Sequence, residues 1–205
     1  MNNSKNLSDF QIRPLDYATA MKIVVEKHYL HRKAPCSFAY GLFLGDDILG
    51  VITYGTPSSA PLRRGICGDE EKFNVIELTR LWVDDSVPKN GESYLIGRTL
   101  KLIDKDIVVS FADASQGHIG VVYQATNWIY TGLSAKRTDW TVTTCTKHGQ
   151  TWADKYTRDQ MDELFGHDFY LKQRPRKHRY VYFRNRKEEL LGKLRYPVRP
   201  YPKRG

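Results

Sequence analysis

Apolar and polar positions between residues 77 and 132 follow one another in blocks that predict a strand, a helix, a second strand and a second helix. Residues 77–83 and 107–112 are apolar and partly β-branched, as buried strands are. Between them, apolar residues recur at helical spacing over residues 93–103. We predict the second helix over about residues 118–130, ended by a glycine.

Polar residues follow each of the two predicted strands. Asn90, Gly91 and Ser93 come after the first strand, and Asp113 and Ser115 come after the second. Two strands joined by a helix form a parallel pair with a right-handed crossover, and such units bind ligands at the carboxyl ends of their strands. Backbone N–H groups at a helix start attract anions such as phosphate. We therefore expect a ligand site here, although caps and turns alone would also explain each residue.

The flanks of this central unit complete a mixed α/β pattern. We expect a strand, a helix capped by Asp16, a hairpin, a further strand, a short helical turn and a last strand over residues 10–15, 17–29, 38–54, 136–146, 162–165 and 180–183. Residues 56–69 are rich in Pro, Gly and Ser and indicate a loop, either a mobile lid or a binding loop. No boundary divides the chain, so we predict one α/β domain with a mixed sheet over residues 1–205.

The composition is that of a globular protein. The chain has 205 residues, of which 40% are hydrophobic, enough for one domain with a core. No apolar run approaches the roughly 18 residues of a membrane helix, and residues 1–9 lack the apolar region of a signal peptide, so a cytoplasmic protein is expected. Three scattered cysteines, without zinc-finger spacing, indicate reduced thiols.

A formal net charge of +9 favours a polyanionic partner, with nucleic acid first. The segment of about residues 172–205 interleaves basic and aromatic side chains, which suits phosphates and unpaired bases. The alternative is a solubilising tail. The candidate DNA-binding cations of this segment and of the 56–69 loop are Arg63, Arg64, Arg174, Arg176, Lys177 and Arg179.

The order of elements resembles that of the GCN5-related acetyltransferase superfamily. There, a splayed pair of central strands admits the acyl-CoA arm, and a Gln/Arg-x-x-Gly-x-Gly/Ala loop before the helix holds the pyrophosphate. Residues 89–94 read Lys-Asn-Gly-Glu-Ser-Tyr at the matching place, so the glycine pattern is only partly kept. The resemblance implies a cofactor site at the strand end, the loop and the next helix end, formed by Val83, Asn90, Gly91, Ser93 and Asn127, with Tyr130 near the thiolate leaving group.

A more specific resemblance, to the Mom family of phage DNA-modification proteins, rests on Glu-Leu-Thr-Arg-Leu-Trp-Val at 77–83, Asn-Gly-Glu-Ser at 90–93, and Ala-Asp…Gly-His-x-Gly…Tyr-Gln-Ala…Asn-Trp within 112–128. Members convert the N6 group of adenine in duplex DNA to a methylcarbamoyl form that resists restriction enzymes. The family is associated with acetyl-CoA and iron. Carried over by position, the implied active site is Arg80, Ser93, Asp113 and Tyr123.

That chemistry suggests a role for each of these side chains. Asp113 is the candidate base or orienting carboxylate for the N6 amine, which is a poor nucleophile. Of Tyr123 and Tyr130, one would protonate a leaving thiolate and the other would stack on an adenine flipped out of the duplex. Arg80 lies in an apolar strand, so we expect an anionic partner, either Glu77, Asp113 or a ligand phosphate.

The bond that forms in this reaction suggests that a metal takes part. Attachment at the methyl carbon of acetate suits a redox metal, and iron fits that need. His28 and His31 are three positions apart and share a face if the helix continues, and His118 lies near Asp113. These three histidines are the candidate ligands. Alternatively, His28 and His31 are only positively charged groups near a helix C-terminus, where the helix dipole favours them.

Two other functions remain open. A plain acetyl-CoA-dependent N-acetyltransferase acting on a modified base, an RNA or a peptide would transfer acetyl without a metal. A non-catalytic nucleic-acid-binding protein on this fold would bind DNA without a cofactor. The expected partner is double-stranded DNA with a flipped adenine, and no membrane is expected. The oligomeric state is open, with a homodimer as one option.

Overall fold

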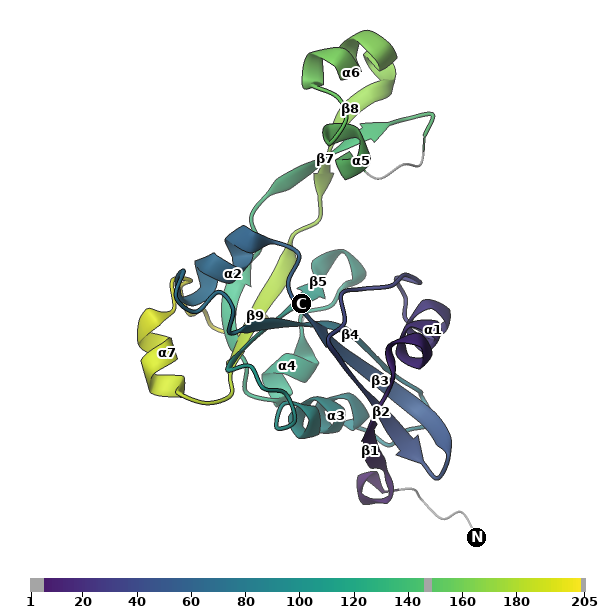
Figure 1. The fold of residues 1–205 in the computed structure, drawn as a ribbon, viewed down its shortest axis with the longest axis vertical. Coiled ribbons are helices and arrows are strands. Elements are labelled where there is room, and N and C mark those ends of the chain that lie inside the picture. Colours follow the sequence, from purple (N-terminus) through teal and green to yellow (C-terminus); the bar gives the residue numbers. More distant parts are fainter. Residues whose placement is uncertain (1–5, 146–148, 204–205) are drawn as a thin grey trace.

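A seven-stranded mixed sheet forms the body of the molecule in a computed structural model, which describes residues 6–145 and 149–203 (Figure 1). The strand order is β1-β2-β3-β4-β5-β9-β6, and β4 and β5 are its parallel pair. These strands are β1 Gln11–Pro14, β2 Phe38–Leu44, β3 Asp47–Gly55, β4 Val75–Val83, β5 Ile107–Asp113, β6 Ile129–Leu133 and β9 Lys177–Phe183.

Helices cover both faces of this sheet. One face packs on α3 and α4, where Leu95, Ile96 and Tyr123 join the largest apolar cluster. The other face packs on α1, α2 and α7, each with its own buried apolar residues. These helices are α1 Tyr17–Lys27, α2 Ala60–Cys67, α3 Gly91–Thr99, α4 Val121–Ala125 and α7 Lys187–Lys193. None of the helices in the described residues is long and apolar enough to span a bilayer.

The central parallel pair comes apart halfway along. Residues 75–77 of β4 pair with residues 107–109 of β5, and beyond this point β4 pairs only with β3. β5 continues to Asp113, paired with β9 on its other side. The two strands therefore leave a gap between their carboxyl ends.

Several predicted elements are confirmed. The side chain of Asp16 accepts a hydrogen bond from the Thr19 amide at 2.9 Å and begins α1. The hairpin forms as β2 and β3 around a turn at Gly45, which takes the left-handed conformation that glycine allows.

The first helix ends at Lys27 because His28 is extended, so His28 and His31 do not share a helical face.

The predicted 56–69 loop is wrong, because it contains α2. Ser59 caps this helix by accepting from the Leu62 amide at 3.3 Å, and proline lies in the first turn, where it costs no hydrogen bond. Ile66 and Cys67 anchor the helix in the core. The Gly, Ser and Pro residues belong to the ends of a helix and do not make it a loop.

The predicted second helix is also wrong over most of its length. α4 covers only Val121–Ala125, and Asn127 then takes a positive φ of 60°. Residues that were expected on the helix form β6, which pairs with β9. β-branched residues favour this strand, and Tyr130 packs into the core from it.

A protruding arm, residues 137–174, was not predicted as a unit (Figure 1). Its strands β7 Arg137–Val142 and β8 Phe169–Arg174 form a separate two-stranded sheet. The helices α5 Gly149–Ala153 and α6 Arg158–Phe165 complete it. A small core of its own contains Val142, Trp152, Met161 and Phe169. Of the strand predicted over residues 136–146, β7 ends at 142 and Thr146 lies outside the described residues.

The basic segment after residue 172 is folded for most of its length. β9 was expected, whereas α7 was not. Arg186, Lys193 and Glu71 form a cluster that holds α7 near the start of β4. Tyr201 donates a hydrogen bond to the Trp128 carbonyl at 2.7 Å. This segment is thus no detached tail up to residue 203, and residues 204–205 lie outside the described range.

Candidate active site

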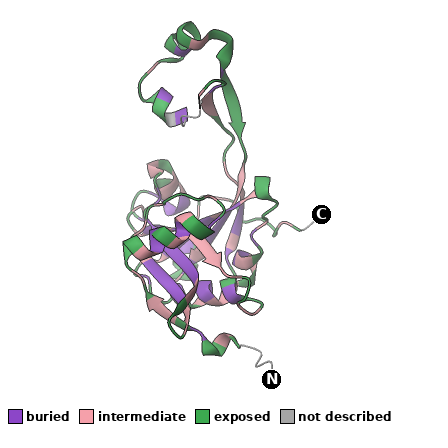
Figure 2. Ribbon diagram, turned by 90° about the vertical axis from the view of Figure 1, so that its right-hand side faces the viewer, coloured by how far each residue is buried: buried purple, intermediate pink, exposed green. Residues whose placement is uncertain are grey.

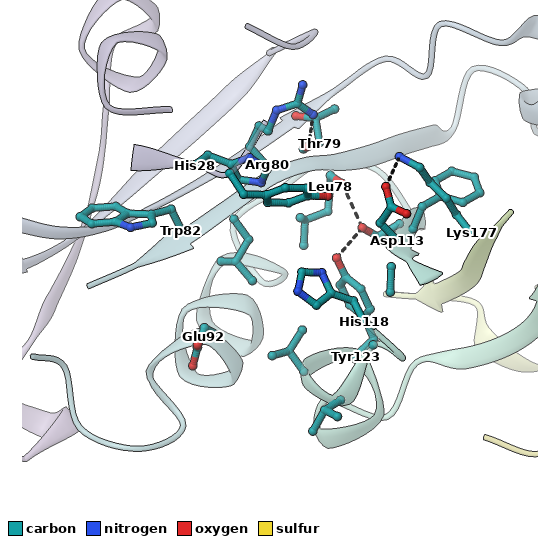
Figure 3. A pocket seen from close by; sticks show the side chains of 18 of the residues that line it. His28, Leu78, Thr79, Arg80, Trp82, Glu92, Asp113, His118, Tyr123 and Lys177 are labelled. Atoms are coloured by element: carbon teal, nitrogen blue, oxygen red, sulfur yellow. Dashed lines mark hydrogen bonds and ion pairs between the residues drawn. The ribbon is translucent and has the colours of Figure 1, made fainter. Parts of the chain in front are cut away.

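A cavity of about 470 Å³ opens where β4 and β5 part (Figure 3). That volume is within the usual range for small-molecule sites. Its walls are the outer half of β4, the end of β5, the loop before α4 and the residue that starts β9. Further lining residues come from the segment after α1, including His28 and Tyr29. The cavity lies where a ligand site was predicted, at the carboxyl ends of the central strands.

Asp113 stands at the end of β5, beside Lys177 of the paired strand β9. The Asp113 Oδ2–Lys177 Nζ distance is 3.6 Å. Asp113 also accepts hydrogen bonds from the Ser115 amide at 3.0 Å and the Ser115 hydroxyl at 2.7 Å. Burial acts to raise the pKa of Asp113, but the Ser115 hydrogen bonds and Lys177 hold it below its usual value. The carboxylate is therefore ionised near neutral pH, and it both caps a turn and lines the site.

Glu77 is a second carboxylate in the cavity wall. It is the last residue of β4 that pairs with β5. Burial raises the pKa of Glu77 to about 7, although Lys177 and Arg80 oppose this. A carboxyl group with such a pKa exchanges a proton near neutral pH, which suits a general base. The sequence indicated Glu77 only as a partner for Arg80, and an acid inside an apolar strand was the available signal.

Tyr123 reaches the cavity from α4 and meets Ser110 of β5. The Ser110 Oγ atom lies 2.8 Å from the Tyr123 hydroxyl and 3.0 Å from the Leu78 carbonyl oxygen. A serine hydroxyl has one proton, so it donates to one of these at a time. When it donates to Tyr123, the tyrosine proton is available to a group in the cavity. Burial raises the pKa of Tyr123 to about 12, which keeps the hydroxyl protonated.

Arg80 lines the cavity, but it forms no ion pair with Glu77 or Asp113, so of its predicted anionic partners only a ligand phosphate remains a prediction. Its guanidinium donates to backbone carbonyls of Thr79 at 2.6 Å, Lys33 at 3.2 Å and Arg32 at 3.4 Å. No ion pair involves it among the described residues. Carbonyl oxygens satisfy the donors but leave the positive charge uncompensated, so an anionic ligand in the cavity would be favoured.

The candidate metal ligands do not converge. His28 lines the cavity, but its Nδ1 atom accepts from the Leu30 amide at 3.1 Å, and burial together with Arg80 lowers its pKa to about 4. His31 contacts the Val25 carbonyl oxygen at 3.0 Å instead. His118 lines the cavity and stacks edge-on against Tyr29. Within residues 6–145 and 149–203, no group of three His, Cys, Asp or Glu side chains could hold a metal ion.

Only part of the predicted cofactor set lies at the cavity. Val83 lines it, and so does Glu92 from the first turn of α3. Ser93 donates its hydroxyl to the Asn90 carbonyl at 3.0 Å and thereby stabilises the helix start. A side chain at Gly91 would approach Val87 Cγ1 to 2.6 Å, so this turn needs glycine for close packing.

Tyr130 and Asn127 lie outside the cavity lining. The Tyr130 hydroxyl is 2.8 Å from His178 Nδ1, and its ring is separated from that of Tyr123 by Tyr180. The reason is the early end of α4, which places Tyr130 on β6 and Asn127 in the turn before it. The predicted approach of Tyr130 to a leaving group is not what the structure shows.

The predicted DNA-binding cations separate into groups. Arg176 donates to the carbonyls of Ser134 and Leu133, and Arg179 is buried with its guanidinium 3.3 Å from the centre of the Tyr196 ring. Both guanidinium groups bond within the fold, although Arg176 is only half-buried, so a role of these two residues in DNA binding stays a prediction. Arg174 pairs with an acid on the arm, and Arg63 and Arg64 lie on α2. Lys177 is the one that lines the cavity.

Comparisons with known proteins agree with this geometry. The family described as the Mom protein family matches residues 9–203. "Methylcarbamoylase mom" of Escherichia phage Mu is 29% identical over 95% of this chain and 84% of the relative. The structure of Arabidopsis thaliana NAA60 in complex with acetyl-CoA aligns with a TM-score of 0.50 and 13% identity, over 85% of this chain and 99% of that one. This likeness confirms the predicted GCN5-related acetyltransferase fold.

A further solved structure, the ribosomal-protein-S5-alanine acetyltransferase from Vibrio fischeri, aligns with a TM-score of 0.49 at 9% identity, covering 90% of this chain and 98% of that one.

Proposed function

The chain belongs to the Mom protein family, and on that premise we propose that it is a DNA-modifying enzyme that converts adenine N6 to the methylcarbamoyl form. The observation that carries the proposal is the cavity between the parted strands, where Glu77, Asp113 and Tyr123 meet. Adenine in a duplex is stacked, so the base has to be flipped out to reach such a cavity. Tyr29 and Trp82 in the cavity walls offer aromatic surface for it.

The donor that suits this cavity is an acyl-CoA. Beyond Glu77, β4 has no strand partner on its β5 side, and although the Leu78 carbonyl accepts from Ser110, the backbone farther along this edge can pair with the amides of an extended pantetheine arm. Val83 lies at the outer end of this edge, and Gly91 keeps the start of α3 close to it. When bound, the cofactor would supply the two carbons of the methylcarbamoyl group. Attachment through the methyl carbon also requires a two-electron oxidant and a nitrogen donor as co-reactants, so the residue roles proposed for this chain are confined to binding and proton positions. Iron does not fit, since the described residues contain no ligand cluster, and we derive no step that uses it.

Different side chains of the cavity accept protons, donate hydrogen bonds or supply charge. Glu77, with its raised pKa, is placed to accept the proton that the N6 amine gives up. The ionised Asp113 and its neighbour Lys177 hydrogen-bond to polar edges of the base or donor. Tyr123 keeps its proton and, when Ser110 donates to the tyrosine oxygen, it donates a hydrogen bond to a group in the cavity. Arg80 contributes a positive charge that favours developing negative charge nearby.

The test is mass spectrometry of nucleosides from plasmid DNA of cells that express the chain. We expect deoxyadenosine bearing one acetamido group with the original sequence and at least a tenfold loss with Asp113→Asn, since amide replacement keeps the cap but removes the charge that faces Lys177. Asp16→Asn is the matched control, because it changes an equivalent capping residue outside the cavity. Equal thermal melts exclude misfolding.

Other outcomes contradict the proposal in different ways. A deoxyadenosine that bears a plain acetyl group would indicate an ordinary N-acetyltransferase acting on DNA. Unmodified DNA together with acetylated RNA or peptide would indicate the same chemistry on another amine. If the Asp113→Asn variant modified DNA fully, Asp113 would have no role in the reaction, and the proposed DNA-modifying function would still stand.

A further inference from the structure

Within the described residues of the protruding arm, the two faces of its two-stranded ribbon differ in character. In an antiparallel pair, residues that stand opposite each other share a face. The pairs Trp140–Leu171 and Val142–Phe169 share one face, on which Trp140, Val142 and Phe169 pack into the arm's small core while Leu171 stays exposed. The alternate pairs form the other face, which we call the outer ribbon face, and it consists of Arg137, Asp139, Thr141, Tyr170, Lys172 and Arg174.

The outer ribbon face is cationic and carries an exposed aromatic ring. It has three basic side chains and one acid. Arg174 binds Asp139 through two hydrogen bonds of 2.9 and 2.6 Å, which leaves two cations in excess. Arg137 and Lys172 are exposed, and Tyr170 is 45% exposed. Neither Arg137 nor Lys172 makes an ion pair within the described part of the chain. Free cations beside a tyrosine are the chemistry that binds phosphates and sugars.

The ribbon is attached directly at the cavity. β6 runs into β7, and β8 runs into β9, whose first residue, Lys177, faces Asp113 in the cavity. The two junctions are fastened together, because Ser134 and Lys177 exchange hydrogen bonds of 2.8 and 2.9 Å. Arg176 adds a bond of 2.6 Å to the Ser134 carbonyl. The ribbon thus leaves the body next to Asp113 and Lys177, which line the cavity, and Figures 1 and 2 show it projecting from the body.

From this placement we propose that the outer ribbon face binds the DNA duplex next to the flipped adenine. The inference rests on the proposed function and adds the surface that grips the substrate. A two-stranded ribbon fits the major groove, which is about 12 Å wide. Each strand has six residues, a length of about 20 Å, similar to the distance across a duplex. A ribbon of this size reaches one groove while the cavity receives a base from the same duplex.

The test is fluorescence anisotropy of a labelled duplex with the full chain at several salt concentrations. The variant Arg137→Ala/Lys172→Ala removes the two free cations, and Lys22→Ala/Lys187→Ala removes two exposed lysines of α1 and α7 as the matched control. We expect the ribbon variant to bind about 10-fold more weakly, with a slope of log affinity against log salt that is less steep by about two. The control should keep the original affinity and slope. Plasmid modification is measured in parallel.

The possible outcomes distinguish failure of the ribbon assignment from failure of the proposed DNA-modifying function. Unchanged affinity and slope in the ribbon variant, with an original chain that binds and modifies DNA, would overturn the ribbon assignment and leave the function standing. Loss of modification in cells without loss of affinity would assign the ribbon to a protein partner instead. An original chain that neither binds nor modifies DNA would overturn both. The exposed Tyr170 gives an independent check, since Tyr170→Ala should weaken binding without changing the salt slope.

Discussion

Glu77 is the residue whose environment differs most from what its type would suggest. An acid at the point where two strands part is held among apolar and cationic neighbours, and burial raises its pKa to about 7. Its folded-state pKa therefore lies above that of the unfolded chain. Such a group stabilises the fold at pH values below the unfolded pKa, and this contribution is lost as pH rises through about 7. Burial of Glu77 therefore lowers the stability of the fold above about pH 7, but it gives the site a base with a pKa near neutral pH.

Glu77→Gln should reveal both effects. The modification rate of the original chain is expected to rise as pH increases through about 7, because only the carboxylate accepts a proton, and the variant should lose at least tenfold activity together with this pH dependence. At pH 8 the variant should be more stable by about 2 kcal/mol, since an amide need not ionise.

The measurements are rate against pH and thermal melts at pH 5 and 8. A variant that keeps the original pH profile would show that the ionisation belongs to another group. Glu26→Gln on the exposed surface of α1 serves as the matched control and should change neither quantity.

The sequence located much of the site at the scale of single residues, but not the contacts. Asp113, Tyr123, Arg80 and Val83 line the cavity as predicted. Ser110 was not found, because a serine within an apolar strand carries no sign of the tyrosine that meets it from a helix thirteen positions later. The partners of Arg80 could not be found either, since they are backbone carbonyls, and any residue provides these.

Elements were predicted well where local pattern and packing agree. The central strands and the helix between them follow from apolar spacing alone. The second helix failed because β6 gains its stability from pairing with β9, which is about 50 residues away in the chain. α2 was missed because its short apolar face is recognisable only against the α7 side of the core. The arm was missed because a small satellite core leaves no boundary in composition.

The arm should unfold separately from the body. Met161 of α6 is fully buried in the arm's own core, and Met161→Ala should destabilise the arm by about 2–4 kcal/mol through the cavity it leaves. Hydrogen exchange should become faster in β7, β8 and α6, while protection in β5 stays unchanged. Met21→Ala, which changes an equally buried residue of α1, is the control and should make hydrogen exchange faster in the body instead. Uniform loss of protection in Met161→Ala would show that arm and body fold as one unit.

On the scale of the whole molecule, Glu71 connects the C-terminal helix to the centre of the chain. It precedes β4 and accepts hydrogen bonds from Arg186 at 2.7 Å and Lys193 at 3.0 Å. The Arg186 hydrogen bond is the main cause that lowers the pKa of Glu71 to about 2. α7 thereby holds the last strand against the sheet, and residues far apart in sequence stabilise each other.

Glu71→Gln should lower the stability of the entire fold. A carboxylate with a lowered folded-state pKa stabilises above its unfolded pKa, and this contribution disappears as pH falls toward about 2. We expect a loss of about 2 kcal/mol at pH 7 that vanishes near pH 2, measured as the difference between the two chains in denaturant melts. Glu188→Gln, an exposed acid in the first turn of α7, is the control. A constant difference at all pH values would mean that packing, not charge, is responsible.

The gap between β4 and β5 also bears on how this protein behaves among other copies of itself. An uncovered strand edge normally recruits other strands and leads to aggregation. Here the uncovered edge of β4 faces inward, with β5 as the opposite wall and α3 and α4 behind it. Only a molecule about as thin as one extended chain can reach it. The protein can therefore keep an edge that pairs readily with a ligand while denying it to the edge strand of a second folded copy.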